Sequence, residues 1–178
     1  MEGNTITVSV KPEIYSYIVQ GIGTDTVPLR KGRTLTRVIV PHLTLASPDT
    51  EEPPVPDGFM PLKFELPQWI RTCESASGRV YCCYPLFRCM ISPEGEAAVR
   101  RFLANSFKQS FRFFMDGYII RQQEESKSDS RIVVKGGVVQ FLMAYHIDVR
   151  ESLVTSLTRD WYRHNDDNEK NLVSPLIY

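Results

Sequence analysis

Four cysteines gather in the middle of the chain, where thiolates at suitable spacing would bind zinc. They are Cys73, Cys82, Cys83 and Cys89. A structural zinc site uses two closely spaced pairs such as C-x-x-C. Here the only close pair is two adjacent cysteines, and no histidine lies near them in the sequence. Because adjacent residues of a strand point to opposite faces, we expect half-buried, reduced thiols and no metal site.

The histidines do not form a recognisable catalytic set with a serine or cysteine. Nucleophilic catalysis needs a nucleophile, a base and a group that orients the base. The possible bases are His42, His146 and His164, and the chain has neither G-x-S-x-G nor a cysteine in a protease context. We therefore expect no catalytic residues and a protein that is not an enzyme.

Two glycine pairs carry a weak signal for phosphate binding. The segment after Gly21 and Gly23 lacks the third glycine of G-x-G-x-x-G. Gly136 and Gly137 would suit a helix start that receives an anion, but a flexible helix start without a ligand explains them better. We expect no cofactor.

The charge is balanced overall and unevenly distributed. The 178 residues hold 21 basic and 21 acidic side chains. This balance argues against binding of nucleic acid through the net charge of the whole protein, but it is compatible with local basic patches. Residues 1–45 carry a net charge of +2, residues 46–66 carry −4 and residues 67–121 carry +4. The basic regions are thus the N-terminal segment and the central part of the chain.

The location is predicted to be cytoplasmic, with no membrane association. No stretch approaches the ~20 apolar residues of a membrane span. The start, MEGNTITVSVKPE, lacks the basic and apolar regions of a secretory signal. Hydrophobic residues make up 42% of the chain and charged residues 24%, an ordinary globular composition.

We predict a long central helix over residues 93–122. Ser92 can cap it, and Pro93 suits the first helical position. Apolar side chains then recur at helical spacing: Val99, Phe102, Leu103, Phe107, Phe111, Phe114, Met115 and Tyr118. Burial of a phenylalanine contributes roughly 1.5–3 kcal/mol, so this aromatic row is assigned to the core rather than to base stacking.

Residues 1–45 are predicted to form a strand–helix–helix segment, a candidate DNA-binding unit. Residues 5–10 alternate as a strand, and a helix from Glu13 ends at Gly21 and Gly23. A turn or short strand follows, and a second helix starts at Arg33 or Thr34 and reaches Pro41, which bends or ends it.

The remaining chain is predicted to be an acidic, proline-rich linker or long loop (46–61) and an α+β domain (62–178). Residues 62–66 and 79–90 read as strands of a short antiparallel hairpin with a turn at 75–78. After the central helix we expect a polar loop over 124–130, a short strand over 131–135 and a C-terminal helical pair. Asp148 and Glu151 have the spacing of a capping box for the second of these helices. The predicted fold class is α+β.

The order of elements over residues 5–43 resembles the ribbon-helix-helix family of dimeric DNA-binding proteins. An alternating strand enters a helix through Pro12-Glu13, and a small polar turn precedes a second helix. The resemblance implies that the strand pairs with that of a second copy and enters the major groove. It implies base contacts by Thr5, Thr7 and Ser9, and a phosphate held by Arg33 and Thr34. The same strand would also fit the edge of a sheet in a mixed domain.

The C-terminal helical pair outlines a second candidate for nucleic-acid contact. Arg150, Ser152, Thr155, Ser156 and Arg159 face away from the apolar side of the last helix, where they could reach phosphates or base edges. Nearby acidic residues weaken the local field, and two packed helices are common in α-rich domains.

These observations predict a small, intracellular, non-enzymatic DNA-binding or regulatory protein. Its binding residues would include the cations Arg30, Lys31, Arg33 and Arg37, and its partner would be double-stranded DNA. The alternative is a structural or accessory protein-interaction module of phage or mobile-element type. That module would bind a protein partner, or a second copy, through the proline-rich loop or the apolar end of the chain.

Overall fold

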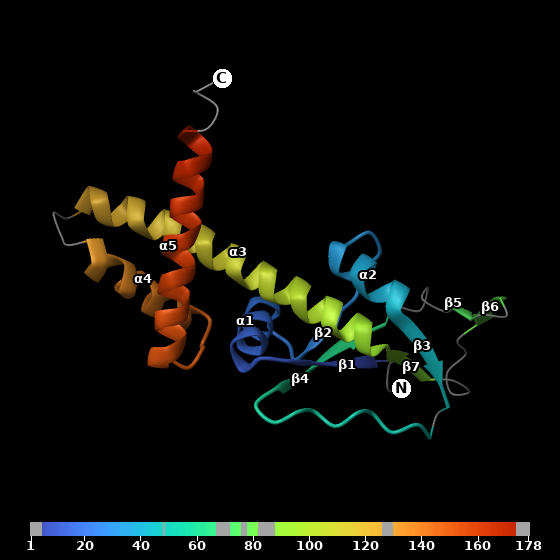
Figure 1. Cartoon of the computed structure of the whole chain (residues 1–178). Helices are drawn as coiled ribbons and strands as arrows, with labels where there is room; N and C mark the ends of the chain where they lie inside the picture. The colour runs from blue at the N-terminus through green and yellow to red at the C-terminus, as the bar shows by residue number, and fades with distance from the viewer. Residues whose placement is uncertain are drawn as a thin grey trace. The chain divides into compact units, whose positions relative to one another are not determined.

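The computed structural model has an α+β fold and describes residues 5–47, 49–66, 72–75, 78–81, 88–125 and 130–173. The chain divides into two compact units, residues 1–106 and residues 107–178. The long helix α3 (Pro93–Glu125) contributes residues to both (Figure 1). The predicted central helix is therefore confirmed. Each unit is described below by itself.

The first unit is built on a three-stranded sheet. Strand β4 (Met60–Glu65) lies between β1 (Thr5–Val10), which runs antiparallel to it, and β2 (Thr26–Pro28), which runs parallel to it. Ile6 and Val8 of β1 and Leu62 and Phe64 of β4 are almost completely enclosed, at the spacing of two that places side chains on one face of a strand. These side chains form the centre of the core of this unit.

Helix α1 (Pro12–Ile22) adds Ile14 and Ile18 to the same core. It ends at Gly23, whose φ of 78° is the left-handed conformation that glycine adopts without strain. Helix α2 (Thr34–Ile39) stops after six residues and continues as the 3-10 turn η1 (Val40–His42). Pro41 lies in η1 and has no N–H to extend the α-helical hydrogen bonds. The predicted strand–helix–helix order is confirmed.

The other strands pair differently from the prediction. Strand β3 (Leu43–Ala46), which was not predicted, pairs with β7 (Arg88–Ile91). The hairpin consists of β5 (Thr72–Ser75) and β6 (Gly78–Tyr81), around the predicted turn. The strand predicted over 62–66 is not part of it, because β4 pairs with β1 and β2. Residues 82–87, part of the predicted strand over 79–90, lie outside the described residues.

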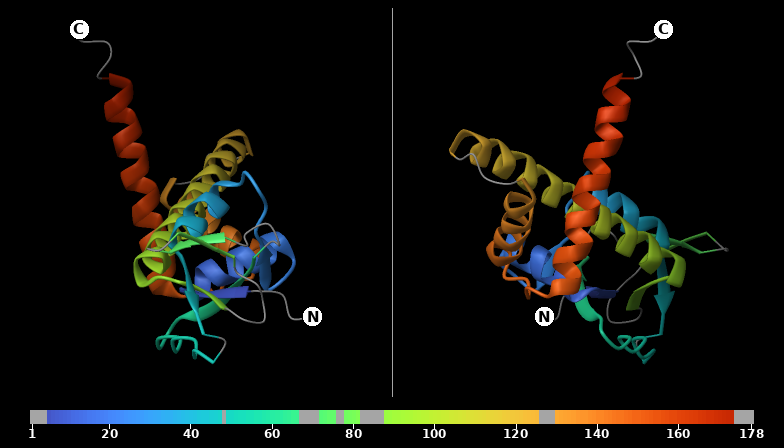
Figure 2. Two further views of the ribbon diagram at one scale, coloured as in Figure 1. Left: turned by 90° about the vertical axis from the view of Figure 1, so that its right-hand side faces the viewer. Right: turned by 60° about the vertical axis from the view of Figure 1, so that its left-hand side comes forward.

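The acidic, proline-rich segment is a loop of the first unit. Residues 49–59 contain neither helix nor strand, and they form an outer loop in the views of Figure 2. The strand that follows this loop is the middle strand of the sheet. The predicted boundary at residues 46–61 and the division of the structure at residues 106 and 107 therefore do not coincide.

Helix α3 begins as its sequence predicted. The Ser92 hydroxyl oxygen accepts a hydrogen bond from the Gly95 N–H at 3.1 Å, which satisfies one free donor of the first turn. Gly95 also permits close packing against η1, because a Cβ there would lie 2.2 Å from the His42 Cβ. The first turn of α3 therefore requires glycine at this position.

The second unit consists of the rest of α3, helix α4 (Ser130–Ala144) and helix α5 (Glu151–Val173). Phe141 of α4 is its aromatic centre. The Phe141 ring lies 5.6, 5.2, 5.4 and 4.9 Å from the ring centroids of Phe107, Phe111, Phe114 and Tyr145. These separations are within the favourable range for aromatic pairs. The predicted role of the phenylalanine row in the core is confirmed at Phe107 and Phe111, which are buried.

The predicted short strand over 131–135 is wrong, because α4 is helical from residue 130 and continues through Gly136 and Gly137. The glycines mark a close contact with α3 rather than a helix start. A Cβ at position 137 would lie 2.6 Å from Tyr118 Cδ1. Residues 124, 125 and 130, which were predicted to belong to a polar loop, are helical in α3 and α4; the rest of that prediction, residues 126–129, lies outside the described residues.

Helix α5 begins at Glu151, so the residue before it is Arg150 rather than the predicted cap Asp148. The Asp148 carbonyl oxygen accepts the Arg150 N–H at 3.1 Å within the turn. Leu157 and Trp161 are buried, and Asp160 binds Arg112 and Lys108 of α3 at 3.0 and 3.4 Å. Among the described residues, no helix is long and apolar enough to cross a membrane.

Candidate functional site

The predicted binding residues lie at the two edges of the three-stranded sheet. Thr5, Thr7 and Ser9 belong to β1, whereas the cations follow β2, and β4 separates the two strands. Since adjacent strands lie about 4.8 Å apart, the two groups are separated by two strand spacings. Thr5 is nearest to the cations in register, because Thr5 and Pro28 both pair with Glu65.

We call Arg30, Lys31, Arg33 and Arg37, with the backbone that carries them, the basic turn. The Leu29 N–H donates to the Glu65 carbonyl at 3.1 Å and the Leu29 side chain is buried, so the chain enters the turn from a fixed point. The Arg33 N–H then donates to the Arg30 carbonyl oxygen at 3.3 Å, and Gly32 has a φ of 81°. This combination defines a type II turn, which favours glycine at its third position.

A hydrogen bond from a buried hydroxyl group stabilises the backbone of the basic turn. Thr36 is 3% exposed, and its Oγ1 donates to the Arg30 carbonyl oxygen at 2.8 Å. The Arg37 N–H donates to the Arg33 carbonyl at 3.2 Å and continues the chain into α2. The backbone of the turn is therefore ordered before any ligand arrives. Thr36 was not identified from the sequence, because its role depends on the turn six residues earlier.

The cationic side chains of the basic turn face solvent. Arg30, Lys31, Arg33 and Arg37 are all exposed, as is Thr34. Within the part of the chain that the structure describes, none of the four cations forms an ion pair with a carboxylate. Four uncompensated cations within eight positions can bind an extended anion, and guanidinium groups match phosphate oxygens in pairs.

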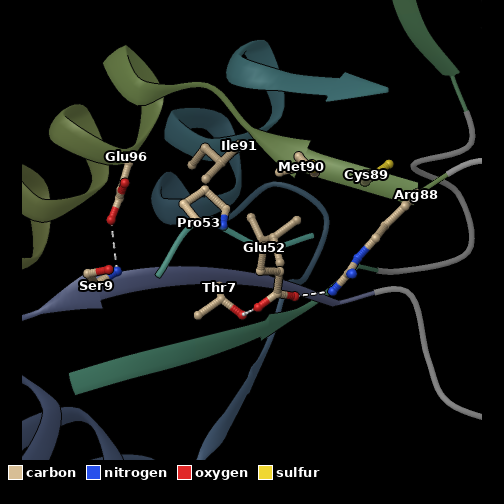
Figure 3. A pocket seen from close by; sticks show the side chains of 10 residues that line it. Thr7, Ser9, Glu52, Pro53, Arg88, Cys89, Met90, Ile91 and Glu96 are labelled. Carbon is tan, nitrogen blue, oxygen red and sulfur yellow. Dashed lines mark hydrogen bonds and ion pairs between the residues drawn. The ribbon is translucent and has the colours of Figure 1, made fainter. Parts of the chain in front are cut away.

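The polar residues of β1 have partners inside the first unit. The Thr7 hydroxyl donates to Glu52 Oε2 at 3.0 Å, and the Ser9 N–H donates to Glu96 Oε1 at 2.9 Å (Figure 3). Ser9 is 8% exposed, which differs from its predicted outward position. Neither carboxylate was identifiable from the sequence, since they lie 45 and 87 residues away from their partners.

Beside β1, a cavity of about 40 Å³ lies between this strand, β7 and the acidic loop (Figure 3). Its wall contains Glu52, which also forms an ion pair with Arg88. Small-molecule sites are typically about 300–1,000 Å³, so this cavity is too small for such a ligand. We interpret its polar contacts as structural, because they hold the acidic loop against the strands.

The cysteines form no metal site within the described residues. Cys89 of β7 is 1% exposed and belongs to the core. No group of three or more potential metal ligands occurs where side chains are described. The side chains of Cys73, Cys82 and Cys83 lie outside that part of the chain.

Comparisons with protein-family models, with curated proteins and with solved structures found no match to this chain.

Proposed function

We propose that this protein binds the phosphate backbone of double-stranded DNA through the basic turn. The observation that carries the proposal is the set of four exposed cations on an ordered turn, without a described carboxylate that neutralises them. Arginine and lysine contacts to phosphates supply most of the sequence-independent affinity for DNA. Because the turn is already ordered, little backbone entropy is lost on binding.

The proposal uses the basic turn and not a strand ribbon. A ribbon of the ribbon-helix-helix type needs the outer edge of β1 for a second copy. Here the Ser9 N–H at that edge is bound by Glu96, and Thr7 is bound by Glu52. A β1–β1 pairing would have to displace these contacts, whereas the basic turn requires no rearrangement.

The expected salt dependence of DNA affinity follows from the release of counterions from the phosphates. Four phosphate contacts give a slope of log K against log salt of about −3.6 on duplex DNA, and an affinity loss of roughly 150-fold between 50 and 200 mM salt. The assay is fluorescence anisotropy of a labelled duplex with the full chain across this salt range.

Two charge-neutralising variants separate the basic turn from overall charge. K31Q/R33Q should halve the slope, to about −1.8, because two phosphate contacts are lost. K63Q/R101Q removes the same charge from exposed positions outside the turn, and it should leave the slope near that of the wild type. The proposal would be contradicted if the slope of log K against log salt fell equally in both variants. It would also be contradicted if the wild type showed no salt-dependent binding.

Self-association is the second candidate function, and exposed apolar residues on α3 favour it. Phe113 and Ile120 are 67% and 59% exposed, and their spacing of seven places them on one helix face. Apolar side chains exposed on one helix face can leave water by packing against a second copy. Sedimentation of F113Q/I120Q should show a smaller species than the wild type. The control is M143Q, at an exposed methionine on α4; a monomeric wild type would contradict this candidate.

A further inference from the structure

We infer that the basic turn is a minor-groove reader, so that the protein prefers A·T-rich duplexes. This inference rests on the proposed function, since it requires that the turn bind DNA. It adds which groove receives the cations and which sequences bind most tightly.

The first argument concerns the shape of the cationic element. Arg30, Lys31 and Arg33 sit at the first, second and fourth positions of one type II turn. The ends of such a turn are less than about 7 Å apart, so three cationic side chains leave from a narrow tip. The minor groove is about 6 Å wide, and narrower in A-tracts, where its negative potential attracts arginine. The tip can therefore place one cation in the groove and the others on the flanking phosphates.

The second argument concerns the elements that would otherwise fill a major groove. That groove admits a helix or a two-stranded ribbon. Helix α2 has only six residues, and its Thr36 and Ile39 are buried in the first unit. Strand β1 is paired with β4, and Ser9 is buried. Among the described elements that carry or adjoin the cations, the turn is the one free to enter a groove.

The third argument concerns charge around the tip. The carboxylate next to the turn in the sheet register is Glu65, which is exposed. Within the described part of the chain it forms no ion pair with Arg30, Lys31 or Arg33. No described ion pair therefore neutralises the cations of the tip, and the narrow minor groove of an A-tract attracts such cations more strongly than a wider groove does.

The test uses three duplexes of equal length whose central segments contain A·T, G·C or inosine·C pairs. Inosine lacks the guanine amino group that marks G·C pairs in the minor groove, but it keeps the major-groove acceptors. A minor-groove reader should bind the A·T and inosine·C duplexes about tenfold more tightly than the G·C duplex. If the inosine·C duplex binds like the G·C duplex, the inference is overturned.

A charge-conserving variant of the full chain provides a second readout. R30K/R33K keeps the phosphate contacts, so its salt slope should match that of the wild type. Its A·T preference should fall severalfold, because a lysine ammonium is more strongly hydrated than a guanidinium and enters a narrow groove at greater cost. A preference that persists in this variant would also overturn the inference.

The two proposals fail in distinguishable ways. Equal binding of all three duplexes, still salt-dependent and still weakened in K31Q/R33Q, would overturn minor-groove reading and leave backbone binding in place. Binding of every duplex that is unaffected by K31Q/R33Q would overturn both proposals, because the DNA contact would then lie elsewhere on the chain.

Discussion

Alanine in place of Gly137 should destabilise the second unit, whereas alanine in place of its neighbour Gly136 should stabilise it. Within a helix alanine is favoured over glycine by about 0.8–1.0 kcal/mol, and both residues lie inside α4. A Cβ at position 137 would lie 2.6 Å from Tyr118 Cδ1 and 2.9 Å from Met115 Sδ and Cε. At position 136 the nearest atom is the Tyr118 hydroxyl oxygen, at 3.2 Å.

The two substitutions differ in their effect on stability because the side chains that face them differ in their freedom to move. Met115 is fully buried, so its side chain cannot move into solvent when a methyl group arrives at position 137. Overpacking typically costs about 1–3 kcal/mol, which outweighs the gain in helix propensity and leaves a net loss of about 0–2 kcal/mol. At position 136 only the far end of Tyr118 must shift by a few tenths of an ångström, so most of the gain remains.

The matched control is Gly117 on α3, which is exposed and has no neighbouring atom within 4 Å of the added Cβ. G117A should raise the free energy of unfolding by about 1 kcal/mol. The assay is urea denaturation followed by the fluorescence of the buried Trp161. A W69F background makes Trp161 the only tryptophan. Unfolding midpoints should rank G117A and G136A above wild type, and G137A below it, at constant m.

An unfolding midpoint of G137A that is raised as much as that of G117A would contradict this prediction. Such a result would mean that the alanine methyl group meets no obstacle, and hence that α4 does not approach α3 at Gly137. A change in m would instead show that G137A alters the compactness of one of the two states, and the midpoints would then not report stability alone.

Two hydrogen-bonded side chains give further predictions. Thr36→Val removes the hydroxyl that donates to the Arg30 carbonyl, and should cost about 1 kcal/mol of stability in urea denaturation and weaken DNA binding in the anisotropy assay. Unchanged stability would mean that the turn does not depend on this bond. Asp160→Asn removes the charge that binds Lys108 and Arg112, and should lower stability by about 1–2 kcal/mol at low salt and by less at high salt. A loss independent of salt would argue against a charge effect.

Periodicity and end signals were sufficient for several elements. Glycine after an apolar helical run located the end of α1 at Gly23, and Ser92-Pro93 located the start of α3. The alternation of residues 5–10 located β1. These signals succeed because they depend on backbone geometry and on neighbours within one or two turns.

The failures occurred where a local pattern has two physical explanations. A pair of glycines suits a helix start, and it also suits a helix interior that another helix approaches closely; at Gly136 and Gly137 the second holds. The proline-rich composition of residues 46–61 allowed either a linker or a long loop; the structure shows a loop that leads into β4, the middle strand of the sheet. Neither outcome could be derived from composition, because each depends on a partner element distant in the sequence.

In the candidate site, too, some features follow from the local sequence and others depend on segments distant in the chain. The clustering of cations between residues 30 and 37, after a turn or short strand, is evident without any tertiary information. The hydrogen bond from the Thr36 hydroxyl to this turn, and the burial of Ser9 beside Glu96, depend on the packing of distant segments. Local sequence sets backbone preference and the alternation of polar and apolar residues, whereas the exposure of a side chain depends on which distant segment packs over its face.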